Sequence, residues 1–211
     1  MDKPVDMKIK VCGMRDADNI RAVESLGIDL MGFIFYPQSP RYVSTVPSYL
    51  PTHCHRVGVF VDTSLPDILA RVETFALDTV QLHGREKREL CLALQSEGLK
   101  VVKALPIATT EDLNASIPYE GAADCFLFDT ACAGHGGSGR RFDWNILKGY
   151  TGSTPFLLSG GISPASLDDL LHLHHPMWAG IDLNSGFETS PGSKDVTSLK
   201  TFIHNLKNKP L

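Results

Sequence analysis

Residues 155–186 read PFLLSGGISPASLDDLLHLHHPMWAGIDLNSG, and this stretch decides the fold. It contains two short apolar strands, Phe156–Leu158 and Trp178–Leu183. Between them, Ser163 supplies a capping hydroxyl, Pro164 takes the first helical position, and a series of leucines follows at helical spacing. Strand, helix and strand in this order predict a βαβ unit with parallel strands.

The same alternation continues toward the N-terminus. Most of the strands are continuous apolar runs, which is typical of parallel strands covered on both faces. Six further strands are expected, at Ile9–Cys12, Leu30–Phe35, Val57–Val61, Thr79–Leu82, Val101–Leu105 and Cys125–Phe128. Eight such units predict an α/β fold, a single (βα)8 TIM barrel over residues 1–211 with outer helices and a flexible tail at 1–7. An open doubly wound sheet is the alternative, but no GxGxxG follows the first strand.

Helix signals separate these strands. Asp16 precedes an apolar series that Gly27 ends, and Ser64 begins a capping-box-like start. An apolar stripe follows over 196–206. After the second strand, four prolines leave room only for a short helix, at Pro37, Pro40, Pro47 and Pro51.

Composition excludes several classes of protein. A content of 43% hydrophobic and 21% charged residues is that of an ordinary globular protein. The net charge of −4 argues against nucleic acid or an anionic membrane as a partner. The chain has no apolar run near the ~20 residues that span a bilayer, and its start lacks the pattern of a signal peptide. We therefore expect a cytoplasmic protein, either a monomer or a homodimer.

The cysteines do not indicate a disulfide framework or a structural zinc site. Their number is odd and no CxxC pair occurs among Cys12, Cys54, Cys91, Cys125 and Cys132. His53-Cys54-His55 resembles a metal cluster, but adjacent residues of an extended chain point to alternate sides. No metal site is expected there.

Two glycine-rich turns stand at the places where barrels bind phosphate. In a parallel barrel, functional groups come from the C-terminal ends of the strands, and phosphate sites follow strands seven and eight. We expect the phosphate-binding residues to be Gly160 and Gly161 after strand seven, with Asp182, Asn184 and Ser185 at and after strand eight. Backbone N–H groups can approach an anion closely at glycine. The alternative is that both segments are only tight turns.

Cys12 and Asp129 end the first and sixth strands and form a candidate pair of base and acid. A thiolate can remove a proton from carbon, and a protonated carboxyl group can donate one. Asp129 follows an apolar run, so burial could keep it protonated. The alternatives are a buried core cysteine and an aspartate that caps the next loop.

Other polar residues belong to the same end of the barrel. Arg41 could hold a carboxylate through paired hydrogen bonds or form a surface ion pair. Gln81 and His83 end the fourth strand, and His83 could titrate in the pocket or satisfy a buried hydrogen bond. The glycine-rich segment 134–139 could be a lid that orders on ligand binding or a disordered loop.

These motifs together resemble the phosphoribosylanthranilate isomerase family over almost the entire chain. The resemblance is carried by segments in a fixed order: Lys10–Gly13, Gly32–Pro37, Ser39–Val43, Val57–Val61, Val80–Gly84, Phe128–Thr130, Gly136–Gly139, Phe142–Trp144, Ser159–Gly161, Ile181–Glu188 and Pro191–Asp195. Two segments depart from the family pattern. Met14-Arg15-Asp16 replaces the more usual Ile-Thr-Arg, and Asn184 stands where serine is more common.

The resemblance implies an Amadori rearrangement of N-(5-phosphoribosyl)anthranilate in tryptophan biosynthesis, without metal or cofactor. It implies that Asp129 is the general acid that opens the furanose ring and that Cys12 is the general base at C2. Arg41 would hold the anthranilate carboxylate, with Gln81 and His83 among the substrate-binding residues.

Three alternatives remain beside this interpretation. A histidine-pathway aldose–ketose isomerase would use two aspartates, and Cys12 argues against it. Indoleglycerol-phosphate synthase would need a network of lysine and glutamate that cannot be placed here. A non-catalytic barrel that binds a phosphate ligand would be indicated by loss of Cys12 or Asp129, and both are present.

Overall fold

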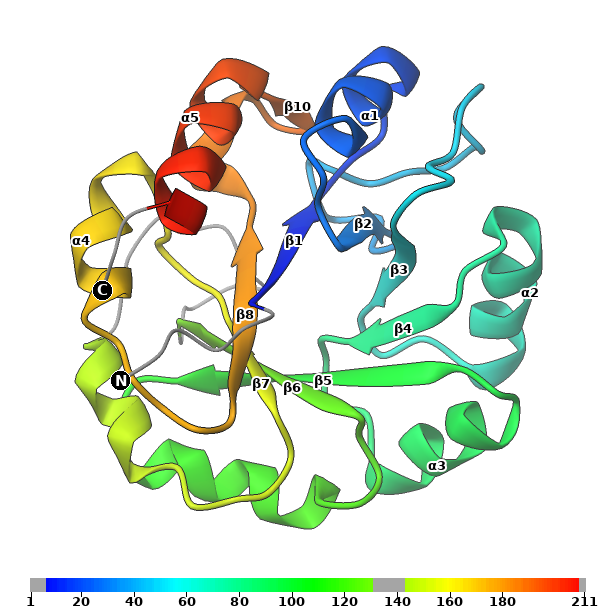
Figure 1. Ribbon diagram of the computed structural model, residues 1–211. Helices are drawn as coiled ribbons and strands as arrows, with labels where there is room; N and C mark the ends of the chain where they lie inside the picture. The colour runs from blue at the N-terminus through cyan, green and yellow to red at the C-terminus, as the bar shows by residue number, and fades with distance from the viewer. Residues whose placement is uncertain (1–6, 131–142, 209–211) are drawn as a thin grey trace.

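The computed structural model describes residues 7–130 and 143–208 as a closed barrel of eight parallel strands in chain order (Figure 1). The predicted fold class is confirmed. The strands are β1 Lys8–Cys12, β2 Leu30–Ile34, β3 His55–Phe60, β4 Thr79–Leu82, β5 Lys100–Ile107, β6 Cys125–Thr130, β7 Phe156–Leu158 and β8 Trp178–Leu183. A small antiparallel hairpin follows β8 and consists of β9 Glu188–Ser190 and β10 Ser193–Lys194. Residues 1–6 of the expected tail at 1–7 and the glycine-rich segment 134–139 lie outside the described residues.

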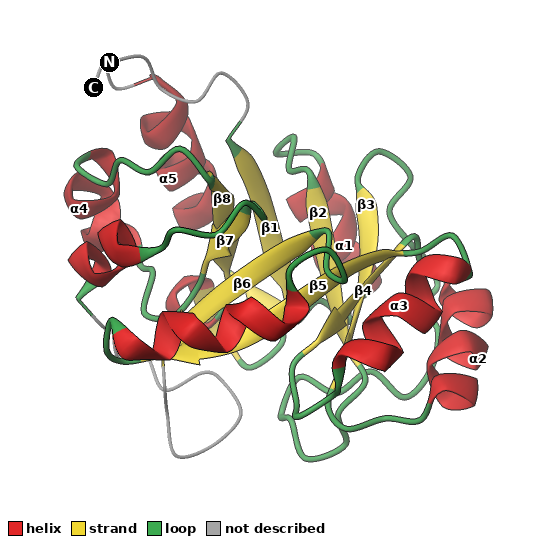
Figure 2. Ribbon diagram, turned by 90° about the horizontal axis from the view of Figure 1, so that it is seen from below, coloured by secondary structure: helices red, strands yellow, loops and turns green. Residues whose placement is uncertain are grey.

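Helical segments surround the barrel on its outer side (Figures 1 and 2). The α-helices are α1 Ala17–Glu24, α2 Leu65–Phe75, α3 Arg88–Ser96, α4 Leu167–Leu171 and α5 Val196–Asn208. There are also 3-10 helices at η1 Glu111–Tyr119, η2 Trp144–Gly149, η3 Pro164–Ser166 and η4 Ser185–Phe187. None of the helices in 7–130 and 143–208 is both long and apolar enough to cross a membrane.

The helix starts read from the sequence are confirmed. The Asp16 side chain accepts a hydrogen bond from the Asn19 N–H at the start of α1, and Ser64 accepts one from the Asp67 N–H at the start of α2. Ser163 forms a capping box at η3. These contacts satisfy N–H groups that have no acceptor within the helix.

The prediction of a short helix between β2 and β3 was wrong. Residues 35–54 contain turns, bends and one bridge between Ile34 and Tyr42 instead. Each proline in this segment lacks an N–H donor and disfavours a helical conformation in the residue before it, so four of them prevent even one regular helix.

Alternate residues of each strand face two different cores. The outward set packs against the helices and includes Ile9 and Val11 on β1. The inward set contains a small apolar cluster of Val102, Ala104 and Leu127 inside the barrel. On β1 the inward positions are therefore those of Lys10 and Cys12. By the same alternation, Gln81, Asp129 and Asp182 face inward on their strands, where a polar group needs a partner.

Candidate active site

Cys12 lies at the C-terminal end of β1, above an ion pair. Lys10 is two residues earlier on the same face, and its Nζ donates to Asp182 Oδ1 at 2.8 Å. The two side chains are 0% and 6% exposed. Because Lys10 and Asp182 are register partners between β1 and β8, the sheet itself holds this pair in place.

The Cys12 thiol is buried among charged groups. Burial raises its pKa above the ordinary value, and the nearby Asp182 carboxylate acts in the same direction. The ammonium groups of Lys10 and Lys194 oppose this rise. Space for the thiol comes from Gly32 on β2, where a Cβ would lie 2.7 Å from Cys12 Sγ. The net pKa of the thiol is raised, and the two cations are the groups that favour its thiolate form.

Asp129 lies within a chain of polar contacts from β4. The Gln81 Nε2 atom is 2.8 Å from His83 Nδ1, and His83 Nε2 is 3.4 Å from Asp129 Oδ2. The other oxygen, Asp129 Oδ1, accepts a hydrogen bond from the Thr130 N–H at 2.8 Å. With Gln81 Nε2 as the donor, His83 Nδ1 is the acceptor, and a neutral His83 then carries its proton on Nε2, toward Asp129.

This arrangement differs from the apolar setting expected for Asp129. The carboxyl group is 14% exposed and each of its oxygens faces an N–H group. The flanking Phe126 and Phe128 belong to the outward core instead. Strand alternation explains the difference, because the aromatic neighbours along the chain point away from the interior.

The two glycine turns lie against each other. A Cβ on Gly186 would be 2.1 Å from the carbonyl oxygen of Ile162, so the turn after β8 touches the turn after β7. Gly160 and Gly161 both have positive φ, at 82° and 69°. Within 7–130 and 143–208, no acceptor is found for the N–H groups of these two glycines. Such N–H groups are available to an anion.

The turn after β7 also contacts the candidate acid. A Cβ on Gly160 would lie 2.2 Å from Thr130 Oγ1 and 2.7 Å from Asp129 Oδ1. Only glycine fits this position, both for its φ and for its contacts. The expected anion-binding turn and the expected acid are therefore neighbours.

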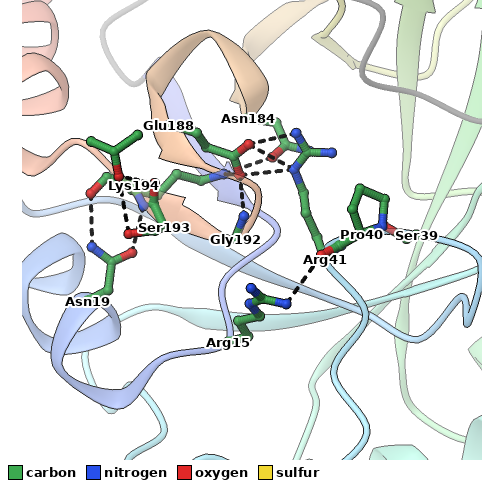
Figure 3. A network of polar contacts seen from close by, with 11 residues as sticks. Arg15, Asn19, Ser39, Pro40, Arg41, Asn184, Glu188, Gly192, Ser193 and Lys194 are labelled. Carbon is green, nitrogen blue, oxygen red and sulfur yellow. Dashed lines mark hydrogen bonds and ion pairs between the residues drawn. The ribbon is translucent and has the colours of Figure 1, made fainter.

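Arg41 reaches the same end of the barrel from the long segment after β2. Its stem crosses Gly13, where a Cβ would lie 2.7 Å from Arg41 Cδ. Its guanidinium group contacts Glu188 of β9 through Nε and Nη2 (Figure 3). The expectation of a surface ion pair does not describe this contact, since the side chains are 11% and 5% exposed.

A family model for N-(5'-phosphoribosyl)anthranilate (PRA) isomerase matches residues 9–205. The chain belongs to the PRA isomerase family. A relative of that name from Phocaeicola vulgatus is 58% identical over 203 residues, which cover 96% of this chain and 99% of the relative. The match therefore extends over the entire barrel.

Solved structures of PRA isomerases have the same fold. The enzyme from Thermotoga maritima is 33% identical, has a TM-score of 0.83 and is covered completely by 96% of this chain. Another PRA isomerase structure, at 32% identity, a TM-score of 0.82 and coverage of 96% and 100%, is in complex with reduced 1-(o-carboxyphenylamino)-1-deoxyribulose 5-phosphate. The chain is thus an isomerase with the TIM barrel of its family.

Asp182, one of the residues expected to bind phosphate, has polar partners of its own. Asp182 faces inward and accepts hydrogen bonds from Lys10 at 2.8 Å and from the Ser159 hydroxyl at 3.5 Å. A carboxylate engaged in this way repels an anion. Asn184 also has a side-chain partner, because its Oδ1 accepts from Lys194 Nζ at 2.8 Å.

Sequence analysis assigned no function to three charged residues of this site, Lys10, Glu188 and Lys194. Lys10 was recognisable in principle, because a lysine inside an apolar strand needs a buried partner. Glu188 and Lys194 belong to segments that carry the family resemblance, but no local pattern connects them to Arg41. Their contacts depend on how the β9–β10 hairpin folds against the segment after β2.

Proposed function

We propose that this chain converts N-(5-phosphoribosyl)anthranilate to 1-(2-carboxyphenylamino)-1-deoxyribulose 5-phosphate, a step of tryptophan biosynthesis. The observation that carries this proposal is the gathering of Cys12, Asp129 and two glycine turns at one end of a PRA isomerase barrel. We expect the enzyme to work in the cytoplasm, as a monomer or a homodimer, on a small-molecule substrate and without nucleic acid.

Asp129 is the general acid in this proposal. Its proton goes to the furanose ring oxygen, the bond from that oxygen to C1 breaks, and a Schiff base forms between C1 and the anthranilate nitrogen. His83 lies 3.4 Å from Asp129 and Gln81 lies behind His83, so both act through the acid. Gln81 is buried, which favours a role in positioning over direct contact with substrate.

Cys12 is the general base. As a thiolate it takes the proton from C2, and the electron pair of that C–H bond forms the C1–C2 double bond of an enolamine. Protonation at C1 and loss of the proton from the C2 hydroxyl then give the ketone. The net change moves hydrogen from C2 to C1, so the reaction needs no oxidant or reductant.

The ends of the substrate carry a carboxylate and a phosphate. We assign the carboxylate to Arg41 and the phosphate to the turns that contain Gly160, Gly161, Asn184 and Ser185. Asp182 is left out of the phosphate site, because its carboxylate already accepts a hydrogen bond from Lys10. Fixing both ends places C2 and the ring oxygen near their catalytic groups.

The test is a fluorescence assay with phosphoribosylanthranilate generated in situ. We expect the emission of the substrate to fall when the purified protein is added. Cys12→Ala and Asp129→Asn should each reduce turnover by about 10²–10⁴-fold, the usual contribution of a general acid or base. Both variants should still bind the reduced product analogue. Cys54→Ala is the control and should keep full activity, because Cys54 directly precedes the N-terminal end of β3, whereas the proposed site lies at the C-terminal ends of the strands.

The outcomes separate the alternatives. No turnover by the unmodified protein, together with binding of a phosphosugar, would favour a binding protein or a neighbouring isomerase. Full turnover by Cys12→Ala or Asp129→Asn would reject the assigned roles while leaving the reaction in place.

A further inference from the structure

Glu188 is the centre of a buried cluster that the proposed chemistry leaves without a role. Its carboxylate accepts hydrogen bonds from Arg41, from Lys194 Nζ at 2.6 Å and from the Gly192 N–H at 3.0 Å (Figure 3). Lys194 is completely buried. The cluster joins the β9–β10 hairpin to the segment that carries Arg41.

Glu188 contacts only one edge of the guanidinium group. Arg41 Nε lies 2.9 and 3.0 Å from the two carboxylate oxygens, and Nη2 lies 2.6 Å from Oε2. No residue in 7–130 or 143–208 accepts a hydrogen bond from Nη1. A guanidinium group has five N–H donors in a planar fork, so the edge formed by Nη1 and Nη2 can still hold a second carboxylate.

The charges of the cluster allow a second anion to bind. Hydrogen bonds from Arg41 and Lys194 outweigh the effect of burial and lower the pKa of Glu188, so the residue is a carboxylate at neutral pH. Burial lowers the pKa of Lys194, and the hydrogen bond to Glu188 and its charge oppose this fall. With Lys194 protonated, one carboxylate shared by two cations leaves one positive charge in excess. Without Lys194, the pair of Arg41 and Glu188 would have no net charge, and the Glu188 carboxylate would repel an incoming carboxylate more strongly.

The fixed edge also lowers the cost of binding. A free arginine side chain loses rotational freedom when it grips a ligand. Glu188 holds the guanidinium plane before substrate arrives, and Gly13 leaves room for the stem of Arg41 to cross the end of β1. The orientation of the Arg41 guanidinium group is thus set before substrate binds.

We propose that Glu188 is a positioning residue that makes the site selective for substrates with an aromatic carboxylate, by fixing Arg41 so that its Nη1–Nη2 edge faces that group. This inference rests on the proposed function, in which Arg41 receives the anthranilate carboxylate. It assigns Glu188 an effect on one part of the substrate only.

The experiment compares two ligands. One is reduced 1-(o-carboxyphenylamino)-1-deoxyribulose 5-phosphate, and the other is the same molecule without the ring carboxyl group. The unmodified protein should bind the carboxylated ligand more tightly by about 10- to 100-fold, the range expected for a paired charge-assisted contact. In Glu188→Gln, this ratio should fall to about threefold or less, while the affinity for the carboxyl-free ligand stays within about twofold.

The direction of the change distinguishes positioning from competition. Glu188→Gln removes a negative charge, so a residue that merely competed for Arg41 would give a larger ratio when replaced. A larger or an unchanged ratio would overturn the inference. Glu111→Gln is the control, because Glu111 is exposed on η1 and its replacement should leave the ratio as it is.

A second variant keeps the inference testable if Glu188→Gln does not fold. Arg41→Lys retains the charge but has no edge for Glu188 to fix, so the ratio should fall to the same level. In the double variant Arg41→Lys with Glu188→Gln, no further loss is expected. An Arg41→Lys protein with the ratio of the unmodified protein would overturn the inference. Failure of the unmodified protein to bind the carboxylated ligand would reject the proposed function itself.

Discussion

Lys10 and Asp182 are register partners where β8 closes the barrel onto β1, and Lys10 Nζ donates to Asp182 Oδ1 at 2.8 Å. Burial alone would lower the pKa of Lys10, but the negative groups Asp182 and Cys12 raise it above its ordinary value. Lys10 is therefore a permanent cation directly below the candidate base. Together with Lys194 from β10, it favours the thiolate that burial and Asp182 oppose.

Replacing Lys10 and replacing Asp182 should shift the pH dependence of kcat/KM in opposite directions. Because Cys12 acts as a thiolate, kcat/KM should rise with pH as the thiol loses its proton. Asp182→Asn removes a charge that raises the pKa of Cys12, so the rise should move to lower pH. Lys10→Met removes a charge that lowers this pKa, so the rise should move to higher pH by about one unit or more.

The measurement is the pH profile of kcat/KM, together with the rate at which iodoacetamide alkylates Cys12. Replacing only one partner of a buried ion pair destabilises a protein strongly. The double variant Lys10→Met with Asp182→Asn serves as the folded reference and should lie between the single variants. Shifts in the same direction for Lys10→Met and Asp182→Asn would contradict this electrostatic role.

Gln81 should affect catalysis through His83. Gln81→Leu removes the donor to His83 Nδ1, which leaves the proton free to move between the two ring nitrogens. We expect kcat to fall by about 3- to 10-fold, the value of one hydrogen bond, with little change in KM. Gln95→Leu on α3 is the control, since Gln95 contacts Asp124 far from this chain of contacts. A rise in KM alone would instead indicate that Gln81 touches the substrate.

Gly160 should be required for both the anion site and the acid. An alanine Cβ there would lie 2.5 Å from the Thr130 backbone nitrogen and 2.7 Å from Asp129 Oδ1. Displacement of the acid and of the turn should lower kcat/KM on the order of 10- to 100-fold. Gly98→Ala is a matched control, because Gly98 has nearly the same φ, 81° against 82°, and nothing within 4 Å of its added Cβ.

Stability and activity should separate in this comparison. Both alanine variants place a Cβ at positive φ, so both should lose about 1–2 kcal/mol of unfolding free energy from that strain. Only Gly160→Ala should lose activity beyond the change in folded population. Equal losses of activity in the two variants would show that backbone strain, and not the contact with Asp129, is responsible.

The sequence predicts the barrel well because its signals are local. Buried parallel strands are continuous apolar runs, and the caps at Asp16 and Ser64 are set by residues three positions apart. The strand alternation that places Cys12 and Asp129 inside the barrel follows from the same runs. In residues 35–54, the four prolines were expected to leave room for a short helix, but the segment contains none.

The site is less predictable because its contacts are distant in sequence. Arg41 and Glu188 are 147 residues apart, and Lys10 and Asp182 are 172 residues apart. The position of Asp182 beside a phosphate turn suggested an anion ligand, and nothing in its neighbourhood pointed to Lys10. Only the closure of the barrel brings these two residues into register.

Glu24 anchors the segment that carries Arg41. This carboxylate at the end of α1 accepts hydrogen bonds from the Tyr49 hydroxyl at 2.5 Å and from the Thr52 and His53 N–H groups at 2.6 Å. These contacts outweigh burial and lower its pKa below the ordinary 4.5. A carboxylate with a lowered pKa stabilises the folded state at pH values above the unfolded pKa, and this contribution is lost as pH falls through the folded pKa.

Glu24→Gln should therefore cost about 1–3 kcal/mol of unfolding free energy at pH 7 and progressively less below about pH 4, as urea unfolding can measure. The exposed Glu111→Gln should change little at either pH, and a gap for Glu24→Gln that is constant with pH would show that the ionised carboxylate is not what anchors this segment.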